Sequence, residues 1–354
     1  MILGWILFVV FMILVCARAY RYGMCRIKAM TGVEQNCYID VRGMKQYLQL
    51  RGNNVNNPVI LMLNPANSVL QNFTTYLFRN ELVDEYTLVY WDQRGCGRTL
   101  FANKREKILY DDLLKDLEVV VDYLCKRFHR EKIILLGYDW GTLLGVEYIS
   151  RHPEKVQAYL SVEQFIDIRE TLEQSTERVM NMYTKNKRKS AHLLFHLVSK
   201  FNTDKVLGNN VSANYFILNK RINQKLYSCN FAEKMLHMWQ VITSPDLEPR
   251  DLKWIFMRTF RFCSYMQNFE DVISKNMQIN IVEKFGVEFE VPFYLLYGEM
   301  DYFVSSDMIK EFYQNLKCPR KNLVELLHAG HEPFLNAPAS FCSAVKNILN
   351  EVRS

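Results

Sequence analysis

The sequence predicts an α/β fold: a mostly parallel, twisted sheet with helices on both faces and a helical lid inserted after the sixth strand. Short apolar runs alternate with longer segments of helical periodicity, which is the pattern of parallel strands joined by crossover helices. The alternation stops over residues 166–285, where helical periodicity and aromatic residues continue without a convincing buried strand, and then resumes. We therefore expect one core formed by residues 37–165 and 286–354, with the lid between them.

The composition is that of an ordinary globular protein, with 49% hydrophobic and 23% charged residues in a chain of 354. Part of the net charge of +6 is local, because residues 18–28 hold Arg18, Arg21, Arg26 and Lys28 and no acidic residue. The rest of the chain is close to balanced and gives no reason to expect nucleic-acid binding. The nine cysteines include no C-x-x-C spacing, which argues against a zinc site and a dense disulfide framework. We expect neither a metal nor another cofactor.

Residues 1–17 form an uninterrupted apolar run, and as a helix they would reach about 26 Å, close to the thickness of the hydrocarbon core of a bilayer. We expect a transmembrane anchor there, followed by a basic juxtamembrane segment over 18–36. The basic residues should stay on the cytoplasmic side, which would make the protein single-pass with a cytoplasmic catalytic domain. The alternative is a cleaved signal peptide, since Ala17-Arg18-Ala19 loosely fits a cleavage site, but the basic n-region of a signal peptide is missing.

The core elements can be assigned in chain order. Two alternating runs, 37–41 and 46–50, flank Arg42-Gly43 and predict a β-hairpin. Apolar residues at helical spacing from Leu113 to Phe128 predict a helix. Buried strands are expected over residues 59–63, 86–91, 132–136, 158–162, 293–297 and 323–327.

The stretch 133–145 predicts a buried strand that turns sharply into a helix, with Asp139 at the tip. Gly137 and Gly141 bracket the tip, and glycines there permit the tight turn of a nucleophile elbow, in which the tip residue is usually serine. Taken alone, the stretch fits equally well a glycine-rich turn in which Asp139 caps the helix.

Two further residues follow strands that come after the lid. Asp301 lies in the turn after the strand at 293–297, and His331 lies in the loop after the strand at 323–327. Open α/β sheets bind ligands at the carboxyl ends of their strands, and the chain order of elbow, acid and histidine is the one that α/β-hydrolases use. The sequence therefore predicts a catalytic triad of Asp139, Asp301 and His331.

These residues belong to longer motifs that carry a family resemblance. Residues 90–99 read Y-W-D-Q-R-G-C-G-R-T, nearly the W-D-Q-R-G-x-G-x-S signature of proline iminopeptidases, and residues 330–334 resemble their histidine loop. Over residues 37–354 the chain resembles the proline-iminopeptidase branch of the α/β-hydrolase superfamily. The elbow, with Trp140 after Asp139, also resembles those of epoxide hydrolases and haloalkane dehalogenases. The resemblance implies a hydrolase that acts on a small molecule or a short peptide.

One departure from the branch concerns the oxyanion hole. The branch has His-Gly-Gly-Pro-Gly after the third strand, where this chain has Asn64-Pro65-Ala66-Asn67-Ser68. Pro65 has no N–H group to donate, so in the simple register the backbone N–H groups of Ala66 and Trp140 are expected to form the oxyanion hole. The residues expected to line the substrate pocket are Asn64, Tyr138 and Trp140.

The second departure is Asp139 itself. A carboxylate that attacked an amide would form a high-energy mixed anhydride, whereas attack on an sp³ carbon with a strained or good leaving group forms an alkyl ester. His331, oriented by Asp301, would then activate water to hydrolyse that ester. The sequence thus predicts a membrane-anchored hydrolase of a small apolar substrate of the epoxide or alkyl halide type. Candidate acids for the opened epoxide oxygen are the lid tyrosines Tyr183, Tyr215, Tyr227 and Tyr265.

Two alternatives stay open at this point. In the first, the chain is a proline-iminopeptidase-like relative in which the aspartate leaves weak or no peptidase activity, and it binds peptides or a partner as a pseudoenzyme. In the second, it is an anchored interaction module whose pocket is closed by lid aromatic residues. The distances from His331 to Asp139 and Asp301 bear on all three hypotheses, because a general base must lie within reach of its partners.

Overall fold

The computed structural model describes residues 2–65, 73–171, 173–174, 231–301 and 303–353. Its centre is an eight-stranded sheet with the order β1-β2-β4-β3-β5-β6-β7-β8. The pairs β1–β2 and β2–β4 are antiparallel, and every pairing from β4 through β3 to β8 is parallel. The predicted fold class is therefore confirmed. The strands are β1 (Val33–Val41), β2 (Met44–Gly52), β3 (Val59–Leu63), β4 (Thr87–Asp92), β5 (Ile133–Tyr138), β6 (Val156–Val162), β7 (Phe293–Gly298) and β8 (Lys321–Leu326).

The hairpin of β1 and β2 forms where the sequence predicts it. Val41 pairs with Met44, so Arg42 and Gly43 make a two-residue turn. Both residues have a positive φ, 54° and 81°, which is the turn geometry that matches the twist of antiparallel strands. The side chain of Asp40 accepts a hydrogen bond from the backbone N–H of Gly43 at 3.1 Å.

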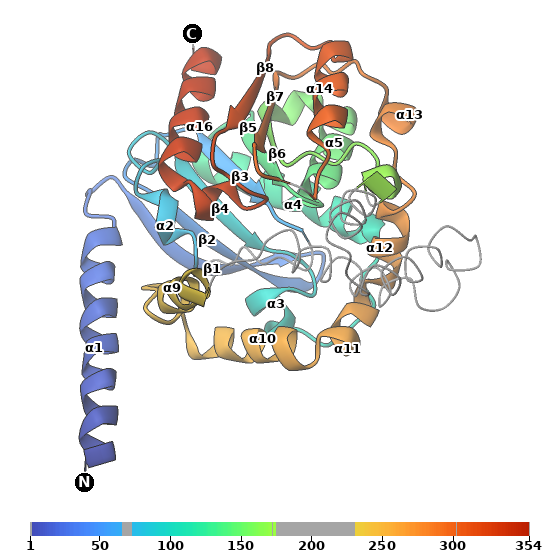
Figure 1. The fold of residues 1–354 in the computed structure, drawn as a ribbon. Coiled ribbons are helices and arrows are strands. Elements are labelled where there is room, and N and C mark those ends of the chain that lie inside the picture. Colours follow the sequence, from blue (N-terminus) through green and yellow to red (C-terminus); the bar gives the residue numbers. More distant parts are fainter. Residues whose placement is uncertain (1, 66–72, 172, 175–230, 302, 354) are drawn as a thin grey trace.

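Helices cover both faces of the sheet (Figure 1). Alternate residues of one strand point to different cores: Leu61 of β3 belongs to the cluster beneath α4 and α5, and Ile60 belongs to the cluster beneath α2 and α16. The core helices are α2 (Tyr76–Arg79), α3 (Gly97–Ala102), α4 (Tyr110–Phe128), α5 (Gly141–Arg151), α14 (Ser306–Asn315), α15 (Pro333–Asn336) and α16 (Pro338–Arg353).

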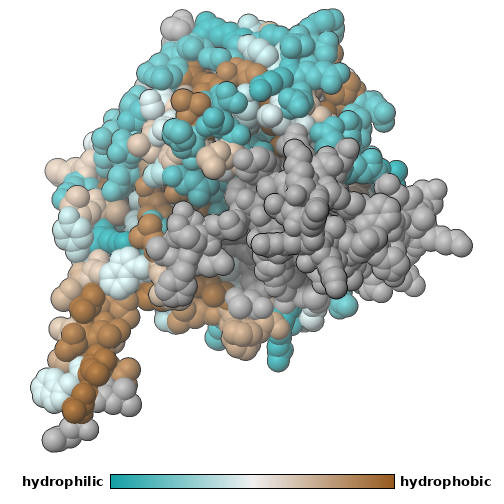
Figure 2. Space-filling model, in the orientation of Figure 1, coloured by the Kyte–Doolittle hydropathy of each residue, from teal (hydrophilic) through white to brown (hydrophobic). Residues whose placement is uncertain are grey.

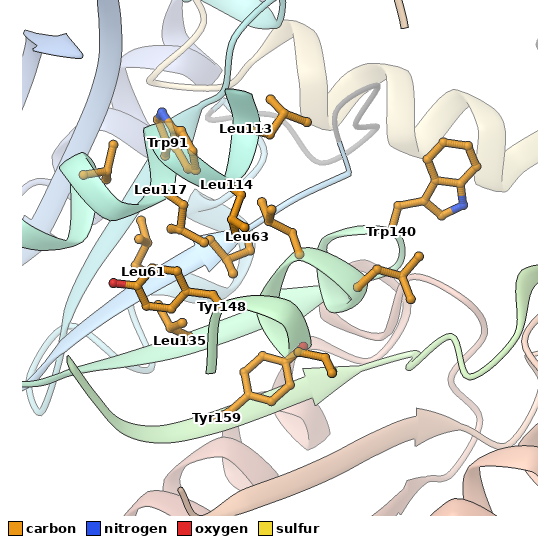
Figure 3. Close-up of a cluster of buried hydrophobic side chains, with 14 of the residues drawn as sticks. Leu61, Leu63, Trp91, Leu113, Leu114, Leu117, Leu135, Trp140, Tyr148 and Tyr159 are labelled. Atoms are coloured by element: carbon orange, nitrogen blue, oxygen red, sulfur yellow. The ribbon is translucent and has the colours of Figure 1, made fainter. Parts of the chain in front are cut away.

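The first of these two clusters supports the elbow. Figure 3 shows leucines of β3 and β5 facing Leu113, Leu114 and Leu117 of α4, with Tyr148 of α5 beside them. These side chains are at most 3% exposed, so the strand and helix that flank Asp139 are fixed by apolar burial. The helical spacing of these leucines had predicted the helix α4.

The described part of the lid is helical. Its helices are α9 (Phe231–Ile242), α10 (Pro249–Phe260), α11 (Phe262–Met266), α12 (Glu270–Asn276) and α13 (Ile281–Phe285). The two ends of the insertion lie together, because Asp167 forms an isolated β-bridge with Asn280 and the N–H of Ile281 donates to the carbonyl of Ile166 at 2.9 Å. Because the insertion leaves the core and returns to it at the same place, β6 and β7, the strands on either side of it, can pair directly.

The N-terminal helix α1 (Ile2–Cys25) points away from the sheet, and its outer part is a continuous apolar surface (Figures 1 and 2). Residues 4–25 are long and apolar enough to cross a membrane, a property that signal sequences share. The helix continues past residue 17, where we expected the basic segment to begin. Arg18 donates to the carbonyl of Leu247, and Arg21 donates to the carbonyl of Gln240 at 3.2 Å and to the hydroxyl of Tyr76.

Candidate active site

Asp139 lies at the tip of a strained turn between β5 and α5. Its φ is 52°, a left-handed value that non-glycine residues rarely adopt and that clusters at functional sites. A Cβ on Gly141 would lie 2.0 Å from the carbonyl oxygen of Leu63, so only glycine lets α5 begin this close to the end of β3. The residue that precedes α5 is Trp140, with no side-chain cap. The alternative that Asp139 serves as a helix cap is therefore wrong.

The structure brings Asp139, Asp301 and His331 together from the carboxyl ends of three elements. His331 Nδ1 lies 2.8 Å from Asp301 Oδ2, and His331 Nε2 lies 3.5 Å from Asp139 Oδ1. The Asp301 side chain is 2% exposed, whereas those of His331 and Asp139 are 15% and 18% exposed. The inner carboxylate thus orients the imidazole, and the outer carboxylate is the one that solvent reaches.

Asp301 is fixed by its own turn as well as by the histidine. Its Oδ1 accepts hydrogen bonds from the backbone N–H groups of Phe303 at 2.7 Å and Val304 at 3.3 Å. The imidazole of His331 packs edge-on against Phe303, with ring centroids 5.1 Å apart, and against Tyr138 at 5.6 Å. These contacts leave the imidazole few other orientations.

The pKa values of Asp301 and His331 are set by two opposing effects, burial and the charges of neighbouring groups. Burial raises the pKa of Asp301, but the charge and hydrogen bond of His331, with further hydrogen bonds, lower it to about 2. Burial lowers the pKa of His331, but Asp301 and Asp139 outweigh burial and raise that pKa well above its ordinary value. These shifts favour a protonated imidazole paired with an ionised Asp301.

A third acidic residue, Glu163, belongs to this cluster, and the sequence reasoning missed it. It directly follows β6, is fully buried, and has a φ of 55°. One carboxylate oxygen of Glu163, one of Asp301 and one ring nitrogen of His331 lie within 4.8 Å of one another. By residue type and spacing the three could hold a metal ion, although Nδ1 of His331 is already paired with Asp301. The sequence signal that could have identified Glu163 is its position as an acidic residue directly after a buried strand.

The predicted oxyanion and pocket residues are placed as follows. Ala66 lies outside the described residues. Trp140 directly precedes α5, and Figure 3 shows its indole at a distance from the labelled leucine side chains of β3, β5 and α4. Asn64 is buried at the end of β3, where its carbonyl accepts a hydrogen bond from Gln93 Nε2 at 2.6 Å. Tyr138 lies beneath His331 and packs against Phe334, with ring centroids 4.8 Å apart.

Two arginines in or near the W-D-Q-R-G motif (residues 91–95) form ion pairs with neighbouring elements. Arg94 binds Asp116 of α4 through two contacts of 2.9 Å. Arg98 binds Asp251 of the lid helix α10 through contacts of 3.1 and 2.8 Å. The motif therefore ties the strand end beside the elbow to α4 and to the lid.

One of the four lid tyrosines can be placed. The hydroxyl of Tyr265 donates to the carbonyl of Gly95 at 3.2 Å, and its ring packs against Trp254 and Phe269. Tyr183, Tyr215 and Tyr227 lie outside the described residues. Tyr265 thus packs the lid against the loop that contains Gly95, the last residue of the W-D-Q-R-G motif.

Comparison with known proteins gives the family. Residues 58–196, which contain the elbow, match the family described as alpha/beta hydrolase fold. A probable aminopeptidase, YbaC of Bacillus subtilis, is 22% identical over 87% of this chain and 93% of its own length. A proline iminopeptidase of Lactobacillus acidophilus is 23% identical over 33% of this chain and 40% of its own.

Comparison with solved structures gives the same fold as the sequence matches. The crystal structure of an epoxide hydrolase from Vigna radiata superimposes with a TM-score of 0.55 at 18% identity, and covers 90% of this chain and 98% of that one. The likeness to the probable aminopeptidase covers most of the chain, and the match to the proline iminopeptidase covers a third of it. The chain belongs to the α/β-hydrolase superfamily and is a hydrolase.

Proposed function

We propose that the protein hydrolyses a small, largely apolar substrate of the epoxide or alkyl halide type through a covalent ester on Asp139. The observation that carries this proposal is the position of Asp139 at the elbow tip, 3.5 Å from a histidine that is itself paired with a buried aspartate. A carboxylate at that place suits displacement at carbon and does not suit amide cleavage, for which the acyl product would be an anhydride.

In the first step, an oxygen of Asp139 bonds to the substrate carbon, and the bond from that carbon to the epoxide oxygen or halide breaks. In the second step, His331 takes a proton from water, and the hydroxide bonds to the carbonyl carbon of the ester. Collapse of the tetrahedral intermediate releases the alcohol and regenerates the carboxylate with one oxygen from water. The N–H of Trp140, with that of Ala66, is proposed to stabilise the oxyanion.

Charge explains how one histidine serves both steps. Before alkylation, the negative charge of Asp139 is one of the causes that raise the pKa of His331. Alkylation turns Asp139 into a neutral ester and removes that cause, while the charge of Asp301 remains, so the pKa of His331 falls and release of its proton becomes easier. For an epoxide, this release balances the proton that the opened oxygen gains. His331 is then neutral when water must be activated.

The test is to stop the reaction between its two steps. A His331→Ala variant incubated with panels of small epoxides and haloalkanes should retain an adduct on Asp139, seen by intact-protein mass spectrometry and peptide mapping. An Asp139→Asn variant is the control and should show no adduct. Absence of an adduct with every member of both panels would overturn the proposal.

A second candidate function is peptide binding with weak or no peptidase activity. It is favoured by the W-D-Q-R-G motif and by the aminopeptidase-named relative that spans most of the chain. An Asp139→Ser variant that cleaves substrates with N-terminal proline would show that the peptidase pocket persists. If neither this variant nor the parent binds such peptides, this candidate is excluded.

We also propose that α1 anchors the protein in a membrane, with the catalytic domain on the cytoplasmic side. Arg18 donates to the carbonyl of Leu247 between α9 and α10, and Arg21 donates to the carbonyl of Gln240 in the last turn of α9, so this part of the lid lies beside the last turns of α1. Their exposed side chains are largely apolar and would meet the membrane surface: Met235, Leu236, Met238, Ile242, Leu252, Phe256 and Phe260. The full-length chain should resist alkaline extraction from membranes and keep its mass of 42.0 kDa. A shortened, extractable product would instead show a cleaved signal peptide.

A further inference from the structure

We infer that Glu163 is a neutral carboxylic acid that donates a hydrogen bond to Asp301 and thereby positions Asp301 for His331. The inference rests on the proposed roles of Asp301 and His331, because a residue that holds Asp301 matters only if that carboxylate orients the base. Glu163 itself touches neither water nor substrate, since it is fully buried. We therefore treat it as a positioning residue.

Glu163 links the end of β6 to the strand that leads to Asp301. Its backbone N–H donates to the carbonyl of Leu296 at 2.9 Å, and its Oε1 accepts a hydrogen bond from the N–H of Gly298 at 2.7 Å. Leu296 and Gly298 both belong to β7, three residues before Asp301 at the nearest. The Oε1 atom is thus held by β7, which leaves Oε2 as the oxygen without a partner among the described residues.

The contact between the carboxyl groups of Glu163 and Asp301 requires a proton. The carboxyl groups of Glu163 and Asp301 lie together in the interior, with oxygen atoms within 4.8 Å of each other, and two ionised carboxylates could only repel, because both are acceptors. The Oε2 atom of Glu163 is buried and has no hydrogen-bond partner among the described residues, and a proton on this oxygen, donated to Asp301, would satisfy it. One of the two groups must therefore be protonated.

The surroundings assign the proton to Glu163. Asp301 faces the imidazole of His331 and two backbone N–H groups, all of which favour its ionised form. Glu163 receives one N–H group and is otherwise enclosed. Burial, and then the charge and hydrogen bond of Asp301, raise the pKa of Glu163 well above its ordinary value. The same hydrogen bond is among the causes that lower the pKa of Asp301.

The neutral state of Glu163 matters for the base. The titratable groups that face it are Asp301, His331, Tyr138 and Tyr297. If Glu163 were ionised, a further negative charge near His331 would hold the imidazole in its protonated form and hinder the uptake of a proton from water. As an acid, Glu163 instead completes the set of donors around Asp301 without adding charge.

The experiment compares Glu163→Gln with Glu163→Leu in the full-length chain. Glutamine has the shape of a protonated glutamate, with an amide that can donate to Asp301 and a carbonyl that can accept from Gly298. The readout is the titration of the His331 imidazole by NMR, assigned from the resonances that a His331→Gln variant loses. This readout needs no turnover. It therefore stays interpretable if no epoxide or haloalkane is ever hydrolysed.

We expect the pKa of His331 to stay within about 0.3 units of the parent value in Glu163→Gln. In Glu163→Leu we expect it to rise by about one unit, because Asp301 loses a donor and its charge acts more fully on the imidazole. A fall of about one unit or more in Glu163→Gln would show that the parent carries a charge there, and would overturn the inference. No change in Glu163→Leu would show that Glu163 does not act on the triad, and would also overturn it.

Infrared spectroscopy supplies a second readout in case Glu163→Leu does not fold. The parent at neutral pH should show a protonated carboxyl band that Glu163→Gln lacks, and its presence in both proteins would contradict the inference. With a substrate in hand, Glu163→Gln should keep kcat within about threefold of the parent while Glu163→Leu loses about 100-fold. Failure to trap an ester on Asp139 would reject the proposed chemistry and leave these results intact.

Discussion

Asp139 and His331 face each other across 3.5 Å, a longer gap than the 2.8 Å that separates the other side of the same imidazole from Asp301. The imidazole is therefore anchored on its inner side and only loosely held on its outer side. Asp139 Oδ1 accepts no hydrogen bond within the described part of the chain. The orientation of the imidazole therefore depends mainly on its contact with Asp301.

Asp301→Asn should slow hydrolysis of the ester much more than its formation. The asparagine cannot accept the Nδ1 proton as a charged partner, so the imidazole loses both its orientation and its basicity, and we expect a loss of about 10²–10⁴-fold in the second step. Single-turnover mass spectrometry would show the ester accumulating in the variant. Asp307→Asn, at an exposed position on α14, is the matched control and should behave as the parent.

The triad should stabilise the fold most strongly in mildly acidic solution. Asp301 has a lowered pKa, about 2, so its contribution is present above its unfolded value near 4 and is lost as the pH falls towards 2. His331 has a raised pKa, so its contribution is complete below its unfolded value of about 6.5 and is lost as the pH rises through the folded value.

The difference in unfolding free energy between the parent and His331→Gln should therefore be largest between about pH 4 and 6.5. Urea unfolding of both proteins across the pH range measures this difference. A difference that did not vary with pH would show that the imidazole and the carboxylates are not coupled in the folded state.

Gly141→Ala should destabilise the protein severely. The new Cβ would lie 2.0 Å from a backbone oxygen of β3, which cannot move aside as a flexible side chain could, and we expect a cost of at least about 3 kcal/mol. Thermal unfolding measures it. Gly23→Ala is the control, because nothing lies within 4 Å of its Cβ position. Equal effects of the two substitutions would contradict the close approach of α5 to β3.

Arg98→Ala should loosen the lid. Arg98 is 1% exposed and pairs with the buried carboxylate of Asp251 at the start of α10. Removing one partner of such a pair leaves an uncompensated charge and costs about 3–5 kcal/mol. Hydrogen exchange over residues 249–260 should speed up markedly. Arg250→Ala removes an exposed arginine of the same helix and should leave that exchange unchanged.

Much of the fold could be predicted from local patterns. The strand at 59–63 has the bounds that its apolar run predicted. The other strands differ from the expected ranges by at most two residues at either end, except that β1 begins four residues earlier than expected. The hairpin turn was predictable because Arg42-Gly43 separates two alternating runs. The chain order of Asp139, Asp301 and His331 was visible because each residue directly follows a strand or its turn.

Other features depend on neighbours that the sequence does not reveal. The roles of Arg94 and Arg98 were not predictable, because their partners Asp116 and Asp251 lie on α4 and on the lid. The continuation of α1 through Arg18 and Arg21 was missed as well. Both arginines find acceptors on the body of the protein, which a reading of charge along the chain does not show.

The sequence by itself determined the fold class, the elbow and the three residues that meet at the candidate site, because periodicity and turn chemistry are local properties of the chain. Only the tertiary structure decided the unequal distances around His331 and the presence of Glu163. The order of strands in the sheet places β6 beside β7, and this pairing brings a buried carboxyl from one strand end against Asp301 on the next. Burial at that contact, which no local pattern encodes, is what favours a proton on Glu163.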